Sequence, residues 1–334
     1  MASFRIVSYN LLVPAYADPT QYDKCDPTFL KTEYRWNLIK SQLENQIVLH
    51  KYTIICLQEV SITMLPELNR FFHQAKYSFF YNLYGAPKSD FMGIGLAIPK
   101  DLTLQSISYI NIGEYLSSFS THEKDEVKPK QHGYIQSLMD YFFPKAVEFK
   151  SMSPWTGAVE RRNVLIFIQV LIENKKLCIG NYHMPCAYRE PDLMYLHSSA
   201  VKEMMFNLSD GEDFVLTGDF NLVPSSNLYQ CLLNSNEDHF QHLFGSDCPS
   251  SYRPTMNRSL KSAYLVANGR EPKYTNFADR EHTGLFCETL DYIFYSGKLV
   301  VDDVLQLPNE PTSASYPDEF NPSDHLMIAA SLHW

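Results

Sequence analysis

The chain has 334 residues, of which 45% are hydrophobic and 20% are charged, and its formal net charge at pH 7 is −10. This composition is typical of a globular protein with a sizeable core. The negative charge argues against extended, non-specific binding of nucleic acid, although it leaves open a narrow site that handles phosphate through a metal ion. The longest strongly apolar run, Val164 to Ile172, is much shorter than the roughly 20 residues of a membrane-spanning helix.

The N-terminus enters a strand-like pattern at once, and no signal or transit peptide is visible. The seven cysteines are odd in number, irregularly spaced and without a CxxC pair. This pattern favours free thiols in a reducing compartment over a disulfide framework or a zinc site. We therefore expect an intracellular, cytoplasmic protein without a membrane partner.

Short apolar runs alternate with amphipathic segments along the chain. The runs that predict strands are Phe4–Tyr9, Thr53–Leu57, Gly93–Ile98, Val164–Ile172, Leu177–Tyr182, Phe214–Leu216, Leu290–Tyr295 and Met327–Leu332. Apolar residues at near-helical spacing predict a helix over Lys31–His50, and Pro191 opens a second helix over Asp192–Phe206. Because these strands are not spaced like βαβ units, we predict an α/β fold with two mixed sheets packed face to face and helices outside.

The segment 117–161 fits this scheme least, since it joins a charged stretch, HEKDEVKPKQ, to a short aromatic helix candidate, YIQSLMDYFF. A loop of this length in a compact domain is usually functional or mobile. We interpret it as an insertion into a single domain that spans residues 1–334.

Charge is also distributed unevenly in the C-terminal part of the chain. Residues 253–282 carry six Lys or Arg against three Asp or Glu, whereas residues 302–324 carry six acids and no Lys or Arg. Both stretches are explained as solvated surface, and the alternative is that the basic one flanks an anionic substrate.

Polar side chains that interrupt or end the apolar runs are the most informative feature. They are Asn10, Glu59, His183, Asp219, Asn221, Asp291, Asp324 and His325. A polar group just past a buried strand is held on a rigid element, where binding and catalytic groups tend to sit. Taken singly, Glu59 could bond nearby backbone, and residues 218–221 or 323–325 could be ordinary turns or caps. Asp291 lies inside an apolar strand and must be paired or hydrogen-bonded, because burying a lone carboxylate is costly.

The types of these residues suit one chemistry. Carboxylate and amide oxygens are the hard ligands that Mg²⁺ prefers, together with substrate phosphate. A histidine with an aspartate partner can stabilise or protonate a phosphoryl oxygen while the aspartate fixes its orientation. Zinc is less favoured, because the sequence has no set of cysteine ligands and no HExxH motif. The motifs GxxxxGK[ST] and GxGxxG are also absent, so neither a phosphate-loop nucleotide site nor a dinucleotide-binding fold is indicated.

Six motifs in this order resemble the endonuclease/exonuclease/phosphatase family, the fold of deoxyribonuclease I and the abasic endonucleases. They are SYN at 8–10, LQEV at 57–60, NYH at 181–183, TGDFN at 217–221, LDYIF at 290–294 and SDH at 323–325. LKSAY (260–264), GREPKYTNF (269–277) and TLDYIFYSG (289–297) are similar to the deadenylase branch, which includes nocturnin, the Angel proteins and the carbon-catabolite-repressor-type nucleases.

The resemblance implies a four-layer α/β sandwich and Mg²⁺-dependent phosphodiester hydrolysis, with Mn²⁺ as a possible substitute. It implies that Glu59 is the principal metal ligand, with Asn10 beside it and Asp324 near the metal.

The resemblance also implies the catalytic roles. Asp219 would orient or deprotonate the attacking water, and Asn221 and His183 would contact the phosphate. Asp291 and His325 would form a dyad that stabilises the pentacoordinate phosphorus.

Three further residues are candidates for substrate binding. Phe286 stands five residues before Asp291, where deadenylases carry an aromatic that stacks on a base, and its alternative is a core phenylalanine. Trp155 and Arg162 precede the long strand and could line the cleft, although a lone tryptophan is more often packing.

The leading hypothesis is therefore a deadenylase-like 3′–5′ exoribonuclease that acts on an RNA 3′ end and releases nucleoside 5′-monophosphates. The alternative is a phosphatase or phosphodiesterase for a small or end-modified nucleotide, such as a 2′,3′-cyclic phosphate, a 2′-5′ oligoadenylate, a dinucleotide phosphate or a damaged DNA end. A third possibility is a catalytically dead binding module that recruits unidentified protein partners through 117–161.

Overall fold

The computed structural model describes residues 2–120, 153–234, 248–254, 257–281 and 283–334. Its helices are α1 Thr32–Leu49, α2 Leu65–Gln74, the 3₁₀ helix η1 Pro87–Ser89, α3 Ile112–Ser118, α5 Pro154–Val159, α6 Pro191–Ser209, α7 Asn227–Leu233 and α8 Ala263–Asn268. Its strands are β1 Ser3–Asn10, β2 Thr53–Val60, β3 Tyr77–Leu83, β4 Gly93–Pro99, β5 Thr103–Asn111, β6 Val164–Ile172, β7 Lys175–His183, β8 Phe214–Asp219, β9 Lys261–Ser262, β10 Asn276–Arg280, β11 Gly284–Glu288, β12 Asp291–Ser296, β13 Val300–Val304 and β14 Ile328–His333.

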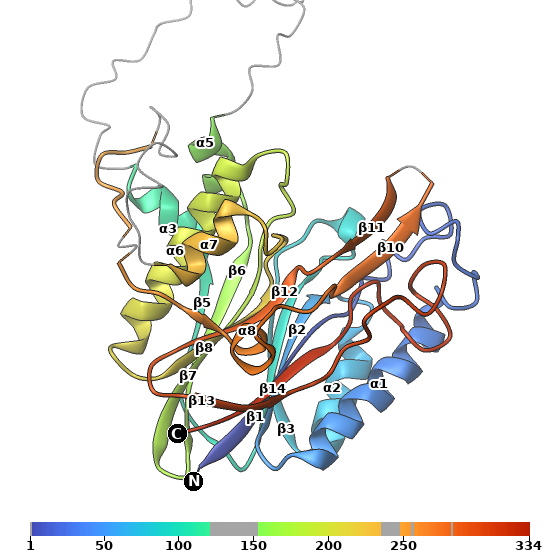
Figure 1. Ribbon diagram of the computed structural model, residues 1–334, viewed down its shortest axis with the longest axis horizontal. Helices are drawn as coiled ribbons and strands as arrows, with labels where there is room; N and C mark the ends of the chain where they lie inside the picture. The colour runs from blue at the N-terminus through green and yellow to red at the C-terminus, as the bar shows by residue number, and fades with distance from the viewer. Residues whose placement is uncertain (1, 121–152, 235–247, 255–256, 282) are drawn as a thin grey trace, which may run out of the picture.

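Two six-stranded mixed sheets form the centre of the molecule (Figure 1). Their strand orders are β13-β14-β1-β2-β4-β3 and β5-β6-β7-β8-β12-β9. Each contains one parallel pair, β1 with β2 and β7 with β8, beside antiparallel pairs. The prediction of two mixed sheets is confirmed, and the eight predicted strands correspond to β1, β2, β4, β6, β7, β8, β12 and β14.

Alternation of side chains along the central strands explains the four layers. Ile54 and Cys56 of β2 face the second sheet and pack in one cluster with Ile166 and Ile179. Ile55 and its neighbours on the other face of β2 pack instead under α1 and α2. A third cluster joins the second sheet to α3, α5, α6 and α7, which lie on its outer side (Figure 1). The predicted helices Lys31–His50 and Asp192–Phe206 are confirmed as α1 and α6.

A buried polar bridge joins the two sheets near the ends of their central strands. The Asn181 amide on β7 donates to the carbonyls of Leu57 at 3.0 Å and Gly95 at 2.8 Å, and its oxygen accepts from Gln58 Nε2 at 2.8 Å. Asn181 belongs to the second sheet, whereas Leu57, Gln58 and Gly95 belong to the first. The bridge fixes how the sheets are placed on each other.

The strand directions bring the polar strand ends to one edge of the sandwich. Asn10 pairs with Gln58 at the ends of β1 and β2, which run parallel. His183 pairs with Asp219 at the ends of the parallel strands β7 and β8, and Asp291 begins the antiparallel β12 opposite Asp219.

Several elements were not predicted. The edge strands β3 and β5 are half-exposed along their length, so their residues show no long apolar run. The hairpin β10–β11 was also missed. The helix candidate YIQSLMDYFF lies outside the described residues. No helix within the described ranges is long and apolar enough to cross a bilayer.

Candidate active site

Asp219 lies at the centre of the polar strand ends and is 1% exposed. Its Oδ2 accepts from Asn10 Nδ2 at 2.9 Å and lies 3.5 Å from His183 Nε2 and 3.7 Å from His325 Nε2. Its Oδ1 accepts from the Asn221 N–H at 2.9 Å. Burial raises the pKa of Asp219, and the charge of His325 opposes that rise.

The residue before Asp219 explains how β8 approaches β7 so closely. Gly218 has a φ of +144°, and a Cβ at this position would lie 1.8 Å from the Tyr182 carbonyl oxygen. Only glycine leaves that space free, so the TGD sequence sets Asp219 directly beside His183.

Asp291 and His325 form a buried pair. Asp291 Oδ2 accepts from His325 Nδ1 at 2.8 Å and from Thr275 Oγ1 at 2.6 Å. Burial acts to lower the pKa of His325, but the charges of Asp291 and Asp219 outweigh it and raise that pKa well above its ordinary value. We infer an imidazolium at neutral pH. Its Nε2–H is directed to the Asp219 side, where 3.7 Å is too long for a hydrogen bond.

Glu59 lies at an irregularity of β2, where the register with β4 shifts between Gln58 and Val60. Its φ of +57° is in the left-handed region, which costs a side-chain-bearing residue about 1–3 kcal/mol and is found most often at functional sites. The Glu59 carboxylate accepts from Val13 N–H at 2.7 Å and from Asn10 Nδ2 at 3.2 Å. The Asn10 amide therefore links Glu59 of the first sheet to Asp219 of the second.

The donor atoms at this edge fit a hard metal ion. Carboxylate oxygens of Asp219 and Asp291 and a ring nitrogen of His325 lie within 4.8 Å of one another, but the imidazolium form of His325 has no lone pair to offer a metal ion. Asp291 Oδ1 and His183 Nδ1 are buried and have no hydrogen-bond partner among the described residues. Buried polar atoms are rarely left unpaired, so these two indicate that a cation, water or substrate completes the site. Carboxylate oxygens suit a divalent ion such as Mg²⁺ or Mn²⁺.

Asp324 is buried beside this cluster, and its carboxylate is already bound by neighbours. Its Oδ2 accepts from the Tyr22 hydroxyl at 2.8 Å and from Arg280 Nη2 at 2.8 Å. Burial acts to raise the pKa of Asp324, but the charges of His325 and Arg280 outweigh burial and lower that pKa. The Asp324 carboxylate anchors the β10–β11 hairpin, which forms the wall of the site. Asp324 does not belong to the group of Asp219, Asp291 and His325.

The three expected substrate-binding residues lie in different surroundings. Phe286 is on β11 and is 41% exposed, as a base-stacking residue would be. Trp155 is buried under the outer helices and donates to Ser120 Oγ at 2.9 Å, so the structure favours its packing alternative. Arg162 is exposed just before β6, and the next residue, Asn163, donates to the His183 carbonyl at 2.8 Å.

Four residues that support the site were not found from sequence. Thr275 holds Asp291, while Tyr22 and Arg280 hold Asp324. Arg35 is buried and donates to the carbonyls of Leu11, Leu12 and Pro322 in the segments beside the site. Thr275 lies within the motif GREPKYTNF, but a single sequence does not show which residue its hydroxyl contacts.

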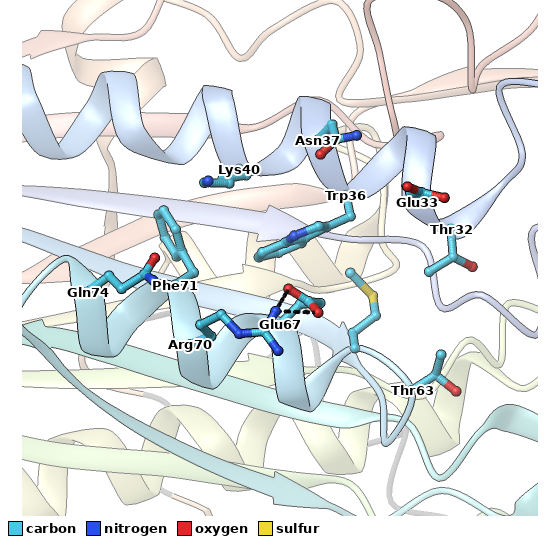
Figure 2. A pocket seen from close by; sticks show the side chains of 11 residues that line it. Thr32, Glu33, Trp36, Asn37, Lys40, Thr63, Glu67, Arg70, Phe71 and Gln74 are labelled. Atoms are coloured by element: carbon cyan, nitrogen blue, oxygen red, sulfur yellow. Dashed lines mark hydrogen bonds and ion pairs between the residues drawn. The ribbon is translucent and has the colours of Figure 1, made fainter.

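A cavity of about 650 Å³ lies between α1 and α2, apart from this cluster (Figure 2). Trp36 and Phe71 lie in it, and its rim includes the ion pair of Glu67 with Arg70 at 2.7 Å. None of its lining residues is a candidate site residue. Since its charged groups include this internal pair, we assign it no ligand.

Comparison with known proteins agrees with the fold and the motif order. A model described as "Endonuclease/Exonuclease/phosphatase family" matches residues 8–325. Human 2′,5′-phosphodiesterase 12 is 27% identical, over 100% of this chain and 52% of that protein. The Candida albicans CCR4-Not complex 3′-5′-exoribonuclease subunit Ccr4 is 24% identical, over 99% of this chain and 41% of that protein. The chain thus spans about half the length, or less, of these relatives.

Among solved structures, ANGEL2, described as a 2′,3′-cyclic phosphatase and bound to adenosine-2′,3′-vanadate, has a TM-score of 0.69 and 20% identity. The match covers 99% of this chain and 95% of that one. At this identity the likeness shows the fold, which is the expected four-layer sandwich.

Proposed function

Because the chain belongs to the endonuclease/exonuclease/phosphatase family, we propose that it is a metal-dependent phosphodiesterase, and specifically a deadenylase-like 3′–5′ exoribonuclease that releases nucleoside 5′-monophosphates. The observation that carries the proposal is the buried His325 between Asp219 and Asp291, with Glu59 on the far side of Asn10. We also propose that residues 1–334 form one catalytic domain, with an insertion at 117–161.

The proposed cofactor is Mg²⁺, with Mn²⁺ as a substitute. Glu59 would hold it, with Asn10 beside the ion and Asp219 near enough to share it. When bound, the ion would neutralise charge that develops on the phosphoryl oxygens. Asp324 would contribute its charge from the adjacent wall, since Tyr22 and Arg280 already bind its Oδ2.

The geometry supports the following proposal for the groups that handle protons. Asp219, whose pKa burial raises, would orient the attacking water and accept its proton. His325 would donate its Nε2–H to a phosphoryl oxygen while Asp291 fixes the ring through Nδ1. His183 and Asn221 would bind the same phosphate, and Asn221 is held in place because its Nδ2 donates to the Met184 carbonyl at 2.9 Å.

The proposed substrate is the 3′ end of an RNA. Phe286 would stack on the terminal base, an interaction worth about 1–3 kcal/mol per base. Arg162 is exposed and would be available to contact the RNA strand. For Trp155 we propose packing and no substrate contact.

A second candidate function is hydrolysis of a small or end-modified nucleotide. It is favoured by the relatives themselves, since a 2′,5′-phosphodiesterase matches the whole chain and the similar structure of ANGEL2 is described as a 2′,3′-cyclic phosphatase. The residues around Asp219 would serve either reaction, because the scissile phosphate is the same group.

The test uses 5′-labelled RNA with a 3′ oligo(A) tail, incubated with Mg²⁺, with EDTA, and with the Glu59→Ala variant. A metal-dependent ladder that slows at the end of the A-run supports a deadenylase, and a uniform ladder a general 3′ exonuclease. A parallel panel contains 2′-5′ oligoadenylate and RNA ending in 2′,3′-cyclic phosphate. Turnover of the panel alone selects the second function, and no turnover anywhere overturns both.

A further inference from the structure

The basic stretch 253–282 places Arg280 beside the site, whereas Arg258 and Lys261 lie elsewhere. Arg258 stacks on the Phe206 ring at 4.4 Å and donates to Asn207. Lys261 lies over Tyr295 at 5.5 Å. Arg280, by contrast, contacts Asp324, the residue before His325. If residues 253–282 contact an anionic substrate at the site, Arg280 is therefore the residue that makes the contact.

The Arg280 guanidinium is anchored on one edge. Its Nη2 donates to Asp324 Oδ2 at 2.8 Å and to the Tyr22 hydroxyl, and the group stacks over the Tyr22 ring at 4.2 Å. Its Nε is buried, and no described residue accepts from it. The side chain is 29% exposed. An arginine has five N–H donors, so this one keeps donors free while its position is fixed.

Arg280 shares a face of the hairpin with Phe286. In the β10–β11 register Ala278 is opposite Phe286 and Arg280 is opposite Gly284. Side chains opposite each other or two residues apart point to the same face, and diagonal neighbours lie about 7–8 Å apart. Ala278 packs in a cluster with Tyr22, so this face is turned toward the segment that contains Tyr22. Phe286 and Arg280 are therefore placed on one face, where they could contact the base and a phosphate of the same oligonucleotide.

The strand that carries Arg280 lies beside the segment that carries His325. It is attached there by the Phe277 N–H, which donates to the Asp324 carbonyl at 2.8 Å. The hydrogen bonds and ion pairs of Arg280 go to Asp324 and Tyr22, and the described residues show none to Asp219, Asp291 or His325.

We propose that Arg280, held by Asp324 and Tyr22, binds a substrate phosphate other than the one that is cleaved. The substrate class is then an oligonucleotide with at least two phosphates, which the site grips at the scissile phosphate and again at Arg280. Arginine suits this role because its planar fork matches phosphate oxygens. This inference rests on the proposed function, since it assumes a phosphodiester substrate.

The experiment measures binding, with EDTA present so that no hydrolysis interferes. Fluorescently labelled ApA, which has one phosphate, and ApApA, which has two, are titrated with the wild type and with Arg280→Met. We expect the variant to bind ApApA roughly 10- to 100-fold more weakly, as for a lost hydrogen bond to a charged group, and to bind ApA like the wild type. For ApApA the slope of log K against log salt should become shallower by about 0.7, the contribution of one phosphate contact on a single strand.

Two variants separate binding from a structural role. Arg280→Lys keeps the charge and should recover part of the affinity for ApApA, and Arg258→Met, from the same basic stretch, should change neither affinity. Because Arg280→Met leaves Asp324 without its cation, the double variant with Asp324→Asn is measured as well, and thermal unfolding confirms that each variant is folded.

Two outcomes would overturn the proposal. Equal weakening of ApA and ApApA means that Arg280 acts on the scissile phosphate or only on Asp324, and unchanged binding of both means that it meets no phosphate. Failure of the proposed function shows separately, as an absence of hydrolysis by the wild type with Mg²⁺.

Discussion

The residues around Asp219 come from two regions that are built differently. One is the set of central strand ends, which carries Asn10, Glu59, His183 and Asp291 and is positioned by strand register. The other is the wall formed by the β10–β11 hairpin, which is held by contacts with residues distant in the sequence. On the proposed function the difference separates chemistry from selection: the strand ends would supply the groups that act on a phosphodiester, and the wall would contribute to the choice of substrate.

The strongest test of the strand-end region is removal of its carboxylates. Glu59→Ala and Asp219→Ala should each lower the rate of hydrolysis by at least about 10³-fold, because charge stabilisation and proton transfer are both lost. Folding should remain largely intact. Initial rates and thermal unfolding of the purified variants check this. Undiminished turnover by either variant would mean that the chemistry takes place elsewhere.

The dyad gives a second test, through pH. Asp291→Asn removes the carboxylate that most raises the pKa of His325, so the alkaline limb of the pH–rate profile should move to lower pH and the rate at pH 7 should fall about 10- to 100-fold. Since the folded-state pKa lies above the unfolded value of about 6.5, the ion pair stabilises the protein fully below that pH and less as the pH rises through the folded-state pKa.

The measurement is a pH–rate profile together with urea unfolding at pH 6 and pH 9. The wild type should lose more stability than Asp291→Asn between these two values. An unchanged profile would count against the dyad, whatever happens to the rate.

A third prediction concerns the wall. Phe286→Ala should weaken binding of an RNA 3′ end by about 1–3 kcal/mol, the usual loss for one stacked base, with little change in kcat or in thermal stability. The control is Leu285→Ala, because Leu285 is 66% exposed on the opposite face of the same strand. Equal effects of the two substitutions would remove Phe286 from the substrate site.

The smallest effect on activity is expected at Trp155. Trp155→Phe removes the hydrogen bond to Ser120 and part of a buried ring, so it should lower stability by about 1–2 kcal/mol and leave KM within about twofold. Urea unfolding and steady-state kinetics measure the two quantities. A selective rise in KM would restore Trp155 to the substrate site.

The same comparison explains what a single sequence can predict. Buried central strands are continuous apolar runs, and a polar residue that ends such a run is conspicuous, so Asp219 and Asp291 could be singled out. The half-exposed β3 and β5 gave no such contrast. Family resemblance led to Phe286 and assigned roles to the strand-end residues. Arg280 and Tyr22 lie 258 positions apart, and only the folded chain brings them together.

The Asn10 amide bridges a carboxylate of each sheet, and the Asn181 bridge lies close by. A small separation of the sheets would break both links before the apolar layer between them met water. In rising denaturant, activity should therefore disappear at a lower concentration than the spectroscopic signal of the core. The loss of activity would then measure the separation of the two sheets, ahead of the unfolding of the core.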